Sequence, residues 1–254
     1  ATIYDLIIDN AQIQGVGRAG ILVGELDGAD TTITNITIKN SSVSGNSSNG
    51  VGGLVGYAKS ASQNINVSNI VIQNTTVTNA NTGAGGLFGM ADGSLINIAD
   101  INMLDVDVTA KGRAGGVFGE IKGAATANIS ITRVVYTGEV KDVSDGYVAG
   151  VIGRPSVDGL TINVSDIVIS GNITATGSNV GHVSGDRSVS ESNVYMIDVT
   201  VVGTLNKQVV DPAYVIDSGV TTIDGAWWTT NINNIASSLV WEYNATSHYY
   251  DLIR

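Results

Sequence analysis

The chain has 254 residues, a formal net charge of −11, only 14% charged residues, 32 glycines and no cysteine. A nucleic-acid surface needs clustered lysine and arginine, and disulfides need cysteine, so the composition excludes both. No apolar run reaches the roughly 18–20 residues of a membrane span, and we expect none.

The first recurring element is a stretch of alternating apolar and polar residues, which opens as IYDLIID at 3–9. Alternation with a period of two is typical of a strand with one buried face. We predict further strands at 33–39, 67–73, 98–104, 164–170 and 196–202. Aligning the copies gives four apolar columns: Ile3, Ile33, Val67, Ile98, Ile131, Val164 and Met196; Leu6, Ile36, Ile70, Ile101, Ile167 and Val199; Ile8, Ile38, Ile72, Met103, Ile169 and Val201; and Ile13, Val43, Val77, Val108, Val140, Ile173 and Leu205.

A glycine-rich phrase follows each strand region, as GVGGLVG at 50–56, AGGLFG at 84–89 and AGGVFG at 114–119. We attribute its glycines to tight corners with positive φ and to a backbone that approaches its neighbour without a Cβ. A phosphate-binding loop is a weaker interpretation, because the Lys-Ser/Thr ending is missing. The phrases lie 30 to 34 residues apart, with a degenerate copy, AYVID, ending at Asp217; the markers are Gly24, Gly56, Gly89, Gly119, Gly153 and Gly185.

A strand period inside a repeat of about 32 residues predicts an all-β solenoid, with apolar columns stacked inside it. We expect about seven coils over residues 1–217. Residues 218–254 contain all three tryptophans and are expected to form an aromatic cap or docking segment.

The motifs GGLVG, GGLFG and GGVFG, each about 32 residues from the next and preceded by strands such as NITIKNSSV, resemble GLUG-motif repeats. That family occurs in secreted and cell-surface proteins, including adhesin-like proteins and the non-catalytic part of bacterial immunoglobulin A proteases. The resemblance implies a right-handed β-helix and an extracellular location. Protease activity does not carry over, because two histidines cannot supply an H-E-x-x-H zinc motif here.

Few residues offer catalytic chemistry. His182 lies in a glycine phrase and His248 in the aromatic segment, and neither has a nucleophile motif beside it. Asp105 and Asp107 flank Val106, so both should leave one face of a strand, where a carbohydrate-cleaving pair is an alternative to a solvated face. A column of Asp5, Asn35, Asn69, Asp100, Asp166 and Asp198 lacks a calcium-loop pattern. We expect no enzyme activity, no metal and no cofactor.

Sequons for N-glycosylation are more frequent than chance predicts. Strand alternation itself favours asparagine two residues before serine or threonine, so some are incidental. In a secreted protein several would carry glycans. The candidates are Asn35, Asn40, Asn46, Asn66, Asn74, Asn128, Asn163, Asn172 and Asn244.

The two ends suggest self-association. A strand stack exposes unpaired backbone at each end, and YYDLI at 249–253 matches IYDLI at 3–7, as if the tail began another coil. Such a head-to-tail contact generates a filament if it does not close. The expected assembly residues are Ile3, Tyr4, Leu6, Ile8, Trp227, Trp228, Trp241, Tyr249, Tyr250, Leu252 and Ile253.

We therefore expect a non-enzymatic structural protein of the cell surface, either a filament or layer subunit or an adhesin stalk, which associates through its solenoid ends. Glycans or host-surface ligands are further expected partners. A carbohydrate-binding or carbohydrate-cleaving β-helix is one alternative. The repeat stalk of a larger secreted enzyme is another.

Overall fold

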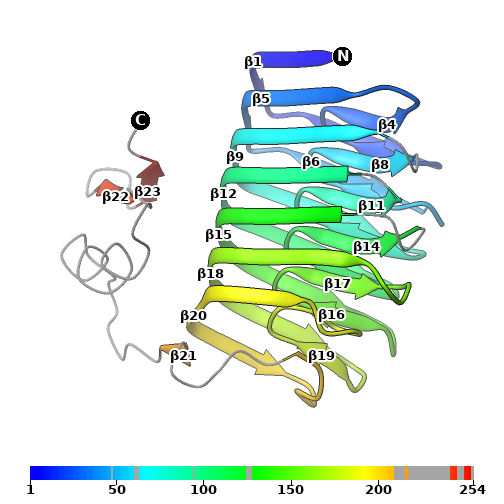
Figure 1. Ribbon diagram of the computed structural model, residues 1–254, viewed down its shortest axis with the longest axis vertical. Helices are drawn as coiled ribbons and strands as arrows, with labels where there is room; N and C mark the ends of the chain where they lie inside the picture. The colour runs from blue at the N-terminus through cyan, green and yellow to red at the C-terminus, as the bar shows by residue number, and fades with distance from the viewer. Residues whose placement is uncertain are drawn as a thin grey trace.

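The computed structural model describes residues 1–46, 48–59, 63–93, 95–123, 128–208, 215–216, 241–244 and 249–252. These residues form strands and turns without any helix, and the strands stack in parallel into a solenoid (Figure 1). The predicted all-β solenoid is therefore confirmed.

Each turn of the solenoid passes through three parallel sheets. Sheet A follows the order β1 (Thr2–Asp9), β5 (Thr31–Lys39), β9 (Asn64–Asn79), β12 (Leu95–Ala110), β15 (Asn128–Asp142), β18 (Thr161–Ala175), β20 (Ser190–Val202) and β21 (Val215–Ile216), with β2 (Gln12–Gly15) and β6 (Ser42–Gly45) beside this path. Sheet B contains β3 (Ala19–Gly20), β7 (Val51–Gly52), β10 (Gly83–Gly85), β13 (Arg113–Gly115), β16 (Tyr147–Ala149) and β19 (Asn179–Gly181). Sheet C contains β4 (Val23–Asp27), β8 (Val55–Lys59), β11 (Phe88–Asp92), β14 (Phe118–Lys122) and β17 (Ile152–Pro155).

The turns number about six rather than seven, because the seventh unit contributes a full strand only to sheet A. Of the AYVID copy, the structure describes two residues. Its Val215 and Ile216 pair with Met196 and Ile197 as a short eighth strand of sheet A.

The four predicted columns are confirmed through the sixth coil and are wrong in the seventh. Val164 pairs with Glu191, Ile169 with Met196 and Ile173 with Val201, so the predicted seventh members lie four or five residues too far along the chain. The cause is a short corner: β18 begins eight residues after Gly153, whereas β20 begins five residues after Gly185 and pairs first with Asn163. The spacing between the glycine markers does not reveal this deletion, because the segment that follows the shortened corner, from Ser190 onward, is correspondingly longer.

The glycine phrases join sheets B and C where their backbones touch. A Cβ on Gly85 would lie 2.0 Å from the Phe88 carbonyl oxygen and 2.6 Å from the Gly119 nitrogen of the next coil. Gly52 is equally confined, and neither glycine has a positive φ. Of the two reasons inferred from sequence, close approach is confirmed and positive φ is wrong for these positions. The adjoining apolar residues fill the core, and the rings of Phe88 and Phe118 stack with centroids 4.9 Å apart.

Sheet A bends at a column of residues in the left-handed conformation. Asp5, Asn35, Asn69, Asp100, Arg133, Asp166 and Asn193 all have φ between 51° and 61°. Asparagine and aspartate tolerate this conformation best, which explains their recurrence. Asn193, and not Asp198, continues the column after Asp166.

Candidate functional site

The open edge of the first coil presents most of the N-terminal residues expected to assemble. Within the described ranges β1 pairs with β5 alone, and it forms one end of the stack (Figure 1). Leu6 belongs to a core column but is 41% exposed, whereas its neighbour Ile36 is 1% exposed. Tyr4 and Ile7 are more exposed still, and Ile3 and Ile8 are partly buried. The edge therefore combines unpaired backbone with uncovered apolar surface.

The C-terminal residues named for assembly lie elsewhere or outside the described residues. Trp227, Trp228 and Ile253 are in the latter group. Trp241 lies in β22 (Trp241–Asn244), and Tyr249, Tyr250 and Leu252 lie in β23 (Tyr249–Leu252). These two strands pair antiparallel with each other, and β23 lies beside β12. The expectation that the tail begins another coil is therefore wrong, despite its match to β1.

Stacked side chains donate hydrogen bonds to the carboxylates of the acidic column. The Asn35 amide donates to Asp5 at 3.0 Å, and the Asn193 amide donates to Asp166 at 2.9 Å. Between them, the Arg133 guanidinium donates to both oxygens of Asp100, at 2.6 and 2.9 Å, and this hydrogen bond raises the pKa of Arg133. The column is a structural ladder whose carboxylates are paired.

Seven of the nine sequons fall into two structural groups. Asn35, Asn40 and Asn74 are left-handed corner residues whose amides donate to Asp5, Asp9 and Asn40. Asn66 accepts a hydrogen bond from Asn97, and the side chain of Asn244 lies outside what the structure describes. The other candidates are exposed on corners and strands: Asn46, Asn128, Asn163 and Asn172. This second group has the surface geometry that a glycan attachment site requires.

The candidate chemical groups do not converge. Asp105 and Asp107 are both exposed beside buried Val106, which confirms that they share one face, and the Asp107 carboxylate accepts a hydrogen bond from the Glu139 backbone at 2.9 Å. His182 is buried, and burial lowers its pKa; His248 lies outside the described residues. Within the described ranges, no three acidic or histidine side chains gather as a metal site.

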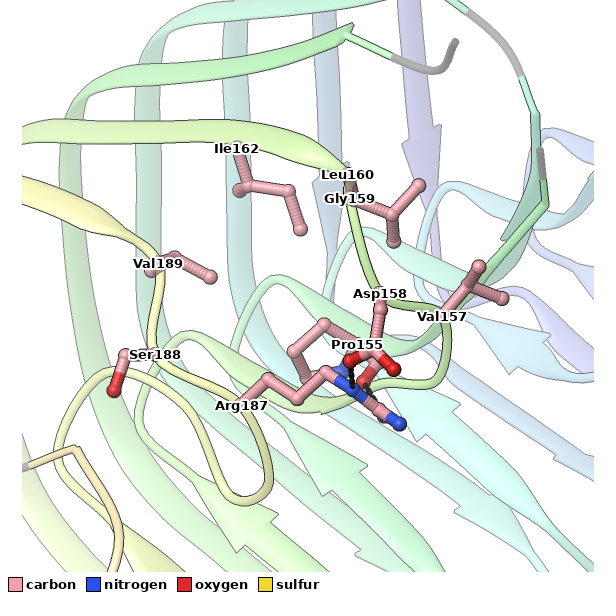
Figure 2. Close-up of a pocket in the computed structure, with 9 residues that line it drawn as sticks. All are labelled: Pro155, Val157, Asp158, Gly159, Leu160, Ile162, Arg187, Ser188 and Val189. Carbon is pink, nitrogen blue, oxygen red and sulfur yellow. Dashed lines mark hydrogen bonds and ion pairs between the residues drawn. The ribbon is translucent and has the colours of Figure 1, made fainter. Parts of the chain in front are cut away.

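A small hollow marks the short corner of the seventh coil. It has a volume of about 190 Å³ and is lined by Pro155, Val157, Asp158, Gly159, Leu160, Ile162, Arg187, Ser188 and Val189. Figure 2 shows Arg187 spanning it, with its Nε donating to Asp158 at 2.6 Å and its Nη1 donating to the Pro155 carbonyl at 2.9 Å. Because Arg187 is also paired with Asp186, its charge is already balanced. The hollow results from the shortened corner and holds no free charge for a ligand.

Sequence reasoning missed an apolar strip on the outer side of sheet A. Val135, Val168, Tyr195 and Ile197 point away from the core and are nevertheless buried. The signal was present as unbroken apolar runs, such as Ile167-Val168-Ile169, which are typical of strands covered on both faces. A search for alternation alone does not reveal such a strip.

Comparisons with known proteins identify the fold. No protein-family model and no curated protein matches the chain. A crystal structure from Bacteroides ovatus, described as a "putative immunoglobulin A1 protease", aligns with a TM-score of 0.67 at 20% identity, over 97% of this chain and 74% of that chain. At this identity the likeness shows a shared β-solenoid fold alone. The GLUG resemblance remains a prediction from the motifs.

None of the described segments forms a helix with the length and apolarity that a membrane crossing takes.

Proposed function

We propose that this protein is a non-enzymatic structural protein of the cell exterior, whose solenoids stack end to end into a surface filament or layer. The observation that carries the proposal is the open edge of β1. Among the described residues, no strand pairs with its outer side, and Leu6 leaves the core column uncovered. An edge of this kind is a template for pairing with another strand.

The opposite end of sheet A offers a matching surface. In the described part of the chain, β21 pairs with only Met196 and Ile197 of the 13-residue strand β20. Both ends therefore present parallel strands of the same sheet, and stacking one copy on another would continue the existing pairing. Such a contact joins two different surfaces, so each added subunit leaves a free end for the next.

Sedimentation of the purified chain tests this proposal. We expect the wild-type protein to form large, concentration-dependent assemblies, and Leu6→Lys to reduce them to single subunits by placing a charge at the open column. Val16→Lys is the matched control, because Val16 is 97% exposed in the same coil and takes no part in the strand edge. Equal assembly of Leu6→Lys and wild type, at equal thermal stability, would refute the proposal.

A second candidate is the repeat stalk of a larger secreted protein, including an adhesin or an enzyme. The observation that favours it is the shared fold with the Bacteroides ovatus protein, of which the alignment covers 74%. In that case the edge of β1 would be covered by a further coil of the same polypeptide. The mass of the intact protein from its native source distinguishes the candidates, because a stalk predicts a chain much heavier than 26.1 kDa.

A further inference from the structure

The outer side of sheet A carries a buried strip that is not part of the core. We define it as the outer strip: Asn102, Leu104, Val135, Val168, Tyr195 and Ile197. Each of these residues is at most 4% exposed, although its neighbours along the strand are the ones that point inward. In the same outward column of the first coil, Ile7 is 74% exposed. The strip is therefore covered from the fourth coil onward and open at the first.

The outer strip differs from the core columns in sequence. Core columns consist mostly of isoleucine and valine, whereas the outward column through Asn102 contains Thr37 in the second coil and Val71 in the third, both half-buried. Val135, Val168, Tyr195 and Ile197 are large apolar residues of the strip that are at most 4% exposed. A surface this apolar is stable in water only when another segment lies on it.

The hairpin β22–β23 is the segment in the right place. β23 lies beside β12, the strand that contributes Asn102 and Leu104 to the outer strip. The hairpin forms its own antiparallel pair and does not join sheet A at an edge, so it can lie across the outer face.

The connection along the same chain is long enough. Residues 217–240 join β21, at the seventh coil, to β22, which is 24 residues. Three strand spacings separate β20 from β12, or about 14 Å, and 24 residues can span about 80 Å. A hairpin from the same chain reaches the strip without strain.

We infer that the outer strip is the docking surface of the chain's own β22–β23 hairpin, which folds back along the side of the solenoid instead of capping its end. This placement goes beyond the proposed end-to-end stacking. The hairpin lies on the face of sheet A, so the backbone edge of β20 stays accessible to a second copy. It also assigns a role to the aromatic segment: the hairpin keeps an apolar sheet face from water.

Cysteine crosslinking tests the occupant directly, because the natural chain has no cysteine to interfere. In the double variant Asn102→Cys with Tyr250→Cys, a short bismaleimide should join the two positions within one chain, and peptide mapping of the monomer band should recover the crosslinked pair. The control is Val16→Cys with Tyr250→Cys, which should give at least tenfold less product. Equal yields in both variants would overturn the inference. Crosslinks found only in dimers would also overturn it, because a second copy would then be the occupant.

Hydroxyl-radical labelling of the unmodified protein provides a test that needs no substitution. We expect Tyr195 to be labelled as slowly as the core residue Tyr136, and both at least tenfold more slowly than Tyr4. Labelling of Tyr195 at the rate of Tyr4 would show an open strip and contradict the inference even if the cysteine variants failed to fold.

Discussion

Replacing Gly85 by alanine tests why the glycine phrase recurs. The added methyl group would lie 2.0 Å from the Phe88 oxygen and 2.6 Å from the Gly119 nitrogen, and both atoms belong to the backbone. Normal carbon contacts are about 3.5–4.0 Å, so the overlap is about 1.5–2.0 Å at the oxygen and about 0.9–1.4 Å at the nitrogen. Relief requires the B and C sheets of two neighbouring coils to separate.

The magnitude follows from this geometry. Overpacking a core side chain costs about 1–3 kcal/mol, and a clash with backbone on two coils should cost at least about 3 kcal/mol. Alanine lowers the conformational entropy of the unfolded chain, which stabilises the folded state by about 0.4–1 kcal/mol and offsets part of this cost. For a chain of this size 1 kcal/mol shifts the melting temperature by about 2–4 °C, so a net cost of at least about 2 kcal/mol should lower it by at least about 4 °C.

Thermal unfolding followed by circular dichroism measures the shift. Gly17→Ala is the control, because nothing lies within 4 Å of a Cβ at Gly17 and its φ is not positive. We expect Gly17→Ala to melt within about 2 °C of wild type. If Gly85→Ala melted with the control, the close-approach explanation of the repeat would be refuted.

Two further predictions concern pH and glycosylation. Burial, and after it the neighbouring Asp92 carboxylate, raise the pKa of Tyr57 to about 12, so the folded protein keeps a proton that the unfolded chain releases near pH 10. The free energy of unfolding should therefore hold below about pH 10 and fall as the pH rises from about 10 through 12. Alkaline melting curves should show a less steep fall for Tyr57→Phe than for wild type. Equal slopes for the variant and wild type would contradict this prediction. Glycopeptide mass spectrometry of the native protein should find occupied sites among Asn46, Asn128, Asn163 and Asn172, and unmodified peptides at Asn35, Asn40 and Asn74, whose amides are held in the corner ladder. The reverse pattern would show that ladder hydrogen bonds do not decide occupancy.

Much of the fold could be predicted from sequence because a solenoid repeats its local physics. Each coil places apolar residues in the same columns, and six copies average out local exceptions. The seventh coil failed because the alignment used glycine spacing, which does not record a shortened corner before Ser190. The recurring Asp and Asn residues of the left-handed column could be seen in the sequence, but their positive φ could not. Arg133 adopts the same conformation although its residue type does not indicate it.

The candidate surfaces were less predictable. The edge residues Tyr4 and Leu6 were found because a strand stack must end with an unpaired strand. The prediction for the tail was wrong because a short sequence match to β1 does not determine which strand β23 pairs with. β23 pairs antiparallel with β22 and does not continue the parallel stack. The outer strip was missed because the burial of Val168 depends on a segment remote in sequence.

Electron microscopy of the protein from its native source tests end-to-end stacking most directly. The seven strands from β1 to β20 along the path of sheet A have six spacings of about 4.8 Å, and with one more at the junction they predict filaments with an axial repeat near 34 Å. Filaments or layers with a repeat of that order would support the account. Single short rods at every concentration would contradict it.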